Sequence, residues 1–79
     1  MNKWEYKMLT VAYPGIDSMH WVKKIDFIEI PNWHERKWLV SKALNDVGRE
    51  GWELVEVVWR TTGNSVMYDP IYILKRPIP

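Results

Sequence analysis

The sequence contains no cysteine, which excludes disulfide bonds and thiolate metal sites. The 79 residues predict one small domain, residues 1–79, able to bury only about 60% of its unfolded surface. Chains of this size that lack disulfides often gain stability by oligomerising. We therefore expect the protein to be a homo-oligomer.

Long apolar runs and an excess of one charge are also absent. No stretch approaches the roughly 18 apolar residues of a membrane span, and Met1–Lys7 lack the apolar core of a signal peptide. The 11 basic and 10 acidic residues are well mixed and leave a net charge of +1. This balance does not favour general nucleic-acid binding. We expect a cytoplasmic protein with neither a membrane nor nucleic acid in general as its partner.

Tryptophan is the residue present in excess, with six in 79 residues. Tryptophan fills cores, anchors interfaces and forms stacking sites. Six indole rings are more than one small core easily hides, so some are expected at an interface or a binding site.

Alternating apolar residues predict four strands. The apolar alternation changes phase in the second strand, which favours a β-bulge near Phe27. Pro70 interrupts the fourth strand and indicates an edge position or a bulge. The strands cover Glu5–Tyr13, His20–Ile30, Trp52–Arg60 and Val66–Arg76, with turns at Pro14–Ser18 and Thr61–Ser65.

One helix is predicted between the second and third strands. Asn32 is a favoured N-cap, and Glu35 three residues later completes a capping-box pattern. Gly51 is expected at the left-handed position that ends the helix. Trp38 points away from the apolar stripe, among polar residues, so we expect it to be exposed in the monomer. The stripe consists of Val40, Ala43, Leu44 and Val47, with Trp33 at its edge.

The predicted fold class is therefore α+β: a four-stranded antiparallel sheet in the order ββαββ, with one helix packed on one face. That helix leaves the other face uncovered, yet apolar residues occupy both parities of the third strand. We expect Val55, Val57 and Trp59 on the face away from the helix, and Trp52 and Leu54 towards it. An exposed apolar face indicates a partner or ligand surface, here first of all a second copy of the chain.

Three segments resemble the DUF4177 family: Trp4–Lys7, the junction from Leu44 to Val55, and Tyr72–Arg76. The glycine–tryptophan junction Gly51–Trp52 is the most specific of them. The resemblance implies a compact sheet-plus-helix domain of bacterial or phage origin, in a family of unknown function. It implies no catalytic residue, because these motif residues have structural character. The segment from Pro14 to Pro31 departs from the family pattern and is longer.

Catalytic and metal-binding motifs are not evident. His20 and His34 are the only histidines, and neither has a second ligand at a metal-binding spacing. The serines have no triad context, and the glycine-containing turn at Gly48–Gly51 follows a helix, which is the wrong end for binding phosphate. We expect a protein that is not an enzyme, with no catalytic residue, no metal and no cofactor.

Aromatic and cationic residues interleave, and this pattern suits nucleotide-like ligands, which need stacking and charge neutralisation. The competing explanation is that the aromatics pack an oligomer interface and the cations surround it; both hold if the site lies between subunits. The candidate ligand-binding residues are Trp21, Lys23, Trp38, Trp59, Arg60, Tyr68 and Tyr72.

The sequence thus favours a non-catalytic, homo-oligomeric module that binds a small nucleotide-like anion at a subunit interface. In a phage, such a module could sequester a host immune signalling nucleotide. The alternative is a protein-interaction or scaffold module that uses the helix-free apolar face of the sheet. A small hydrolase is the third hypothesis.

Overall fold

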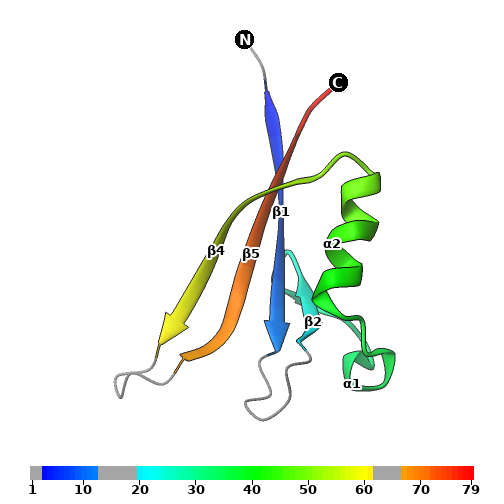
Figure 1. Cartoon of the computed structure of the whole chain (residues 1–79), viewed down its shortest axis with the longest axis vertical. Helices are drawn as coiled ribbons and strands as arrows, with labels where there is room; N and C mark the ends of the chain where they lie inside the picture. The colour runs from blue at the N-terminus through cyan, green and yellow to red at the C-terminus, as the bar shows by residue number, and fades with distance from the viewer. Residues whose placement is uncertain (1–2, 13–19, 62–66) are drawn as a thin grey trace.

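The computed structural model describes residues 3–12, 20–61 and 67–79 and has an α+β fold (Figure 1). The expected turn at Pro14–Ser18 and most of the one at Thr61–Ser65 lie outside these residues. All strand pairs of the sheet are antiparallel, and its order is β3-β2-β1-β5-β4. The described elements are β1 (Trp4–Ala12), β2 (Trp21–Ile25), β3 (Ile28–Glu29), α1 (Trp33–Arg36), α2 (Val40–Arg49), β4 (Glu53–Thr61) and β5 (Met67–Pro77).

The sheet has five strands, so the prediction of four was wrong. The expected strand over His20–Ile30 is divided into β2 and β3 by a tight turn at Asp26 and Phe27. Both turn residues have positive φ, 51° and 67°, the backbone signature of a two-residue hairpin. The phase change near Phe27 therefore marks a hairpin and not the expected bulge.

The predicted single helix is two helices, α1 and α2. Lys37 has a φ of 49°, which ends α1 because a left-handed residue cannot continue a right-handed helix. The expected capping box is also wrong, since Asn32 is itself left-handed and its side chain forms no capping hydrogen bond. Even α2, with ten residues, is too short to cross a membrane, and the same holds for α1, the other helix that the structure describes.

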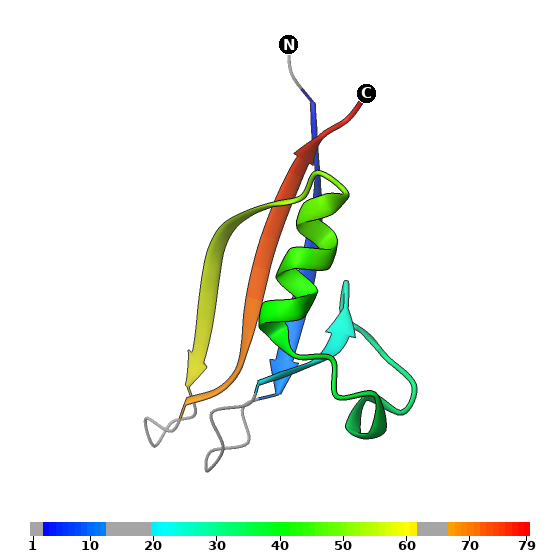
Figure 2. The same ribbon diagram turned by 45° about the vertical axis from the view of Figure 1, so that its right-hand side comes forward.

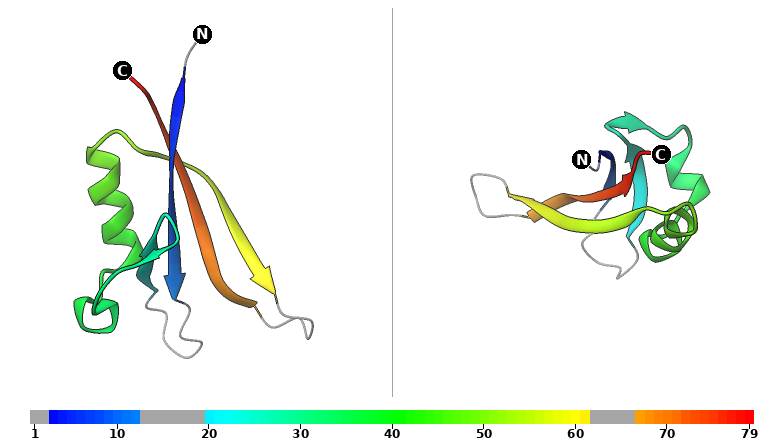
Figure 3. Two further views of the ribbon diagram at one scale, coloured as in Figure 1. Left: turned by 180° about the vertical axis from the view of Figure 1, so that it is seen from behind. Right: turned by 90° about the horizontal axis from the view of Figure 1, so that it is seen from above.

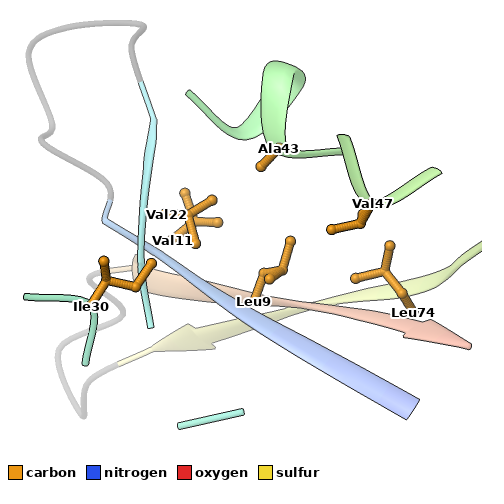
Figure 4. Close-up of a cluster of buried hydrophobic side chains, with 7 residues drawn as sticks. All are labelled: Leu9, Val11, Val22, Ile30, Ala43, Val47 and Leu74. Atoms are coloured by element: carbon orange, nitrogen blue, oxygen red, sulfur yellow. The ribbon is translucent and has the colours of Figure 1, made fainter. Parts of the chain in front are cut away.

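The core contains side chains from α2 and from three strands of the sheet (Figure 4). The expected apolar stripe of α2 is confirmed, because Ala43 and Val47 are buried and Val40 and Leu44 pack against the same cluster. Figure 2 shows α2 running in front of β1 and β5. The buried apolar residues are Leu9, Val11, Val22, Ile30, Ala43, Val47 and Leu74.

β5 lies in the middle of the sheet, between β1 and β4. Its register with β4 shifts between Val58 and Arg60, where two residues of β5, Asp69 and Pro70, oppose one of β4, Trp59. Pro70 lies within this irregularity, beside Asp69 with its positive φ, and is buried. Of the two positions expected for Pro70, the structure has the bulge and not the edge.

A second register shift changes the side on which β4 residues lie. Between Leu54 and Glu56 the strand contains one extra residue. Leu54 pairs with Leu74, and Val57 pairs with Tyr72, whose other partner is Leu9. Paired residues share a side of the sheet, so Leu54 and Val57 lie on the side of the core residues Leu9 and Leu74, which we call the core side.

The expectation that Val57 and Trp59 point away from the core was therefore wrong. Regular alternation beyond the bulge places Trp59 on the same side as Val57. Glu56 and Val58, paired with Ile73 and Ile71, lie on the opposite side, which we call the outer side. Figures 1 and 3 show that the end of β4 farthest from the termini lies well away from α2.

Gly51 ends α2 in the left-handed conformation predicted from the sequence, with a φ of +92°. The backbone N–H of Gly51 donates to the carbonyl oxygen of Gly48 (3.0 Å) and that of Trp52 to the carbonyl oxygen of Val47 (3.1 Å). These two bonds form a Schellman motif with Gly51 at C′. The turn lets β4 begin at Glu53, three residues after the helix C-cap Glu50.

Gly51→Val should lower the free energy of unfolding by about 1–2 kcal/mol, measured by urea denaturation, because a β-carbon is strained at this φ. A clash contributes nothing, since no atom of a non-adjacent described residue lies within 4 Å of the place where that carbon would lie. The matched control is Gly48→Ala, which also meets open space but lies inside α2 and should stabilise by about 0.5–1 kcal/mol. Equal stability of Gly51→Val and the wild type would contradict this account of the junction.

Candidate functional site

A pocket of about 480 Å³ lies where the link between α1 and α2 meets the first turn of α2. Its lining contains three cationic side chains, one indole ring, one leucine and one carboxylate. The lining residues are Arg36, Lys37, Trp38, Leu39, Lys42 and Asp46. We call it the Trp38 pocket.

Backbone hydrogen bonds hold this segment against β2. The carbonyl oxygen of Trp38 accepts from the N–H of Val22 (2.9 Å), and the N–H of Val40 donates to the carbonyl oxygen of His20 (2.8 Å). Leu39 forms an isolated bridge with Trp21. The left-handed Lys37 produces the change of direction that brings the chain alongside β2. The backbone of the pocket is thereby fixed by the sheet.

Trp38 is oriented by its neighbours in the pocket. Its Nε1–H donates to Oδ2 of Asp46 (3.0 Å), and the guanidinium carbon of Arg36 lies 4.9 Å from its ring centroid. The ring is half-buried and packs against the core cluster. The expectation that Trp38 is exposed on the polar face of a helix was wrong, because it lies in the link that follows Lys37 and not in a helix.

The charge of the Trp38 pocket is positive. The carboxylate of Asp46 is already shared, because its Oδ1 accepts from Nη1 of Arg49 at 3.0 Å. Among the described residues, no carboxylate forms an ion pair with Arg36, Lys37 or Lys42. The first turn of α2 contains no acidic residue and has no side-chain cap, so its N–H groups add positive potential. An anion would be favoured in this pocket over a cation.

The structure brings together only some of the residues predicted from the sequence. Trp21 and Trp38 are neighbours, and Nζ of Lys37 lies 5.8 Å from the ring centroid of Trp21. Lys23 is on the same strand as Trp21, but it forms an ion pair with Asp69 and does not line the pocket. Trp21 and Lys23 therefore flank the site, and Trp38 lines it.

The remaining predicted residues lie elsewhere. Trp59 is in β4, at the far side of the sheet from β2, and its side chain is 45% exposed. Tyr72 is half-buried against the core. Arg60 and Tyr68 are backbone partners in β4 and β5, and their side chains lie outside the described part of the structure. Of the predicted residues whose side chains are described, only Trp38 lines the Trp38 pocket.

Sequence reasoning missed Arg36, Lys37 and Asp46, and it treated Lys42 only as part of a polar helix face. Three cations flank Trp38 within seven residues, and this density is the signal that could have identified them. The break at Lys37 had no sequence signal, because lysine has no preference for the left-handed region.

A second cluster surrounds Trp52, at the junction of α2 and β4. Nζ of Lys7 lies 4.9 Å from the indole ring centroid and the guanidinium carbon of Arg76 lies 4.3 Å from it. Arg76 also forms an ion pair with Glu5 and donates from Nη1 to the carbonyl oxygen of Glu50 (2.9 Å). One guanidinium thereby connects β1, β5 and the end of α2. We call this the Trp52 cluster.

Neither histidine shows metal-site geometry. His34 stacks on Trp33, with ring centroids 3.6 Å apart and an interplanar angle of 27°. Over residues 3–12, 20–61 and 67–79, no group of three histidine, aspartate or glutamate side chains converges as metal ligands would. No cation site is therefore indicated in these segments.

The Trp52 cluster contains residues from all three segments that resemble a known family: Glu5 and Lys7, Glu50 and Trp52, and Arg76. The family model for DUF4177, described as a domain of unknown function, matches residues 4–77. The chain belongs to the DUF4177 family. No curated protein and no solved structure matches it. The family residues in the Trp52 cluster connect β1, β5 and the end of α2.

Arg76→Lys should lower the free energy of unfolding by about 1 kcal/mol, measured by urea denaturation. A lysine ammonium can retain the ion pair with Glu5, but it cannot also stack as a plane on Trp52 and reach the carbonyl oxygen of Glu50. Arg49→Lys is the matched control, because Arg49 forms a single exposed ion pair with Asp46, and its stability should change by less than about 0.5 kcal/mol. Equal effects of the two changes would show that the Trp52 cluster contributes no more than a surface ion pair.

Proposed function

We propose that this DUF4177 protein is a non-catalytic, homo-oligomeric module that binds a small nucleotide-like anion in the Trp38 pocket. The observation that carries the proposal is the combination of one oriented indole ring with three cations that have no ion-pair partner among the described residues. Stacking surfaces and positive charge are the two features that a base and a phosphate require. The volume of about 480 Å³ falls within the range typical of small-molecule sites, about 300–1,000 Å³.

The positions of the cations suggest how such a ligand would bind. Lys42 is in the first turn of α2, so its ammonium and the positive end of the helix dipole would neutralise a phosphate together. Arg36 lies over the Trp38 ring and would offer its guanidinium plane to a base or a second phosphate. Asp46 would act indirectly, by fixing the indole ring through Nε1.

The proposal also includes a homo-oligomer and a biological role in which the ligand is sequestered. Trp59 and Arg60 lie on β4, three strands from the β2 strand that holds the Trp38 pocket, and a neighbouring subunit is the means by which they would approach it. A cytoplasmic module of this size, without catalytic groups, would act by sequestering its ligand. In a phage, the ligand would be a host immune signalling nucleotide, which makes an anti-defence role the biological hypothesis.

The second candidate is a protein-interaction module that uses the outer side of the sheet. Tyr6 is 56% exposed and Val58 is 36% exposed, and both lie on this side, in β1 and β4. Exposed apolar residues on a sheet face favour docking to another protein. This candidate requires no small ligand, and the binding experiment separates the two.

Calorimetric titration with a panel of linear and cyclic mono- and dinucleotides should detect binding to the wild type. Lys42→Ala and Arg36→Ala should each weaken that binding by about 1.5–3 kcal/mol, or roughly 10- to 150-fold, through the loss of one charge-assisted contact. Lys42→Ala should leave stability nearly unchanged, because the side chain is exposed and alanine is a good helix former. Pyrophosphate should compete if the phosphates provide the main contact.

Lys24→Ala is the control for the loss of one positive charge, because Lys24 pairs with Thr10 on β1 and does not line the pocket. Arg60→Ala tests the residue set predicted from the sequence. A loss of affinity in Arg60→Ala with none in Lys42→Ala would move the site to β4. Failure of the whole panel to bind the wild type would favour the protein-interaction module.

A further inference from the structure

The core side of β4 is an apolar surface that extends beyond the core. It consists of Leu54, Val57 and Trp59, and we call it the β4 surface. Val57 pairs with Tyr72, which itself packs against the buried cluster, so the β4 surface is continuous with the core. Leu54 is 43% exposed and Trp59 is 45% exposed.

α2 does not cover the β4 surface. The core residues of the sheet come from β1, β2 and β5, and none comes from the part of β4 whose side chains are described, Glu53 to Trp59. In Figures 1 and 3, β4 curves away from α2 as it approaches the end farthest from the termini. The β4 surface also contains no charged side chain. Leaving these residues in water forgoes the free energy that burial of apolar area provides.

The dimensions of the chain indicate how much surface is left uncovered. The radius of gyration is 13.4 Å, whereas a compact domain of 79 residues has about 11.6 Å. The accessible surface is 5759 Å², whereas a folded monomer of this mass exposes about 5,050 Å². This excess of about 700 Å² belongs to the chain as a whole, and the exposed side chains of Leu54 and Trp59 contribute to it.

Charge distinguishes the two sides of β4 as surfaces for self-association. On the outer side, Glu56 is exposed and its β5 partner is Ile73, so it has no cation directly across the pair. A partner packed on the outer side would take the exposed Glu56 carboxylate out of water, which costs free energy unless a cation lies across the interface. The core side of β4 has no such penalty. The surface that fits the β4 surface is one that is also apolar and extends over the same length of strand.

We propose that a second copy of this chain packs on the β4 surface about a two-fold axis and completes the core. This inference rests on the homo-oligomeric part of the proposed function and specifies the interface. Tyr72 and Leu54 of each copy would then lie between two sheets, and β4 would be covered on its core side. The outer side, with Glu56 and Val58, would remain in contact with solvent.

Sedimentation velocity at micromolar concentrations tests the proposal on three proteins. The wild type should sediment as a dimer or a multiple of dimers. Leu54→Glu should self-associate more than about a hundredfold more weakly, because each interface would bury an unpaired carboxylate. Val58→Glu adds the same charge to the same strand on the outer side, at a residue of comparable exposure, and should remain dimeric. Circular dichroism tests whether both variants are folded.

Two outcomes would overturn the proposal, and they differ in what else they affect. A monomeric wild type would remove both this interface and the homo-oligomer of the proposed function. A dimer disrupted by Val58→Glu but not by Leu54→Glu would place the interface on the outer side and leave the proposed function intact. Nucleotide titration of Leu54→Glu then reports whether the Trp38 pocket needs the second copy.

A spin-label measurement covers the case in which Leu54→Glu fails to fold. The chain has no cysteine, so Leu54→Cys and Val58→Cys each provide one labelling site. Electron–electron distance measurements should give a shorter distance between copies for the label at position 54 than at position 58. The reverse order would refute the β4 surface as the interface.

Discussion

α2 is ten residues long, so it extends over about 15 Å. Five strands about 4.8 Å apart form a sheet about 19 Å wide, and a helix about 10 Å in diameter covers only part of that width. The rest of the structure depends on this difference between the width of the sheet and the width that the helix covers. The buried apolar residues come from α2, from β1, β2 and β5, and from Ile30 just after β3, and none comes from the described side chains of β4. An incomplete core explains why the chain is less compact than its length predicts and why a further partner would stabilise it.

Most of the residues with strained backbone lie near the edge of the sheet opposite β4, around β2, β3 and α1. Asp26, Phe27, Asn32 and Lys37 all have positive φ, although none is glycine. Hydrogen bonds offset that strain. The N–H of Asp26 donates to the carbonyl oxygen of Met8 (2.7 Å), and its carboxylate accepts from the N–H of Met8 (2.9 Å). The sheet thus holds a segment of unfavourable conformations, and residues held in this way often belong to functional sites. The Trp38 pocket begins in this segment.

The sequence predicted the parts of the fold that depend on periodicity and on glycine. The stripe of α2 and the left-handed Gly51 could be recognised because apolar spacing and the absence of a β-carbon have direct physical consequences. The hairpin at Asp26–Phe27 and the break at Lys37 could not, because neither phenylalanine nor lysine favours positive φ. One extra residue in β4 reversed the side assigned to Val57 and Trp59, since strand periodicity is two. The break at Lys37 changes the direction of the chain beside Trp38, so the cations that line the Trp38 pocket were missed.

Cations pair with most of the tryptophans, and the pairs differ in one respect that bears on function. Arg76 beside Trp52 is neutralised by Glu5, and Lys23, 6.0 Å from the centroid of the Trp33 ring, is neutralised by Asp69. In both pairs the positive charge is satisfied within the chain, so the contact is structural. Beside Trp38, the carboxylate of Asp46 accepts from the indole N–H and pairs with Arg49. Among the described residues, the cations of the pocket therefore have no ion-pair partner. Uncompensated charge costs little in water, but several like charges in one pocket repel one another. An anionic ligand would relieve that repulsion, and this is the physical basis of the binding proposed for the Trp38 pocket and not for the Trp52 cluster.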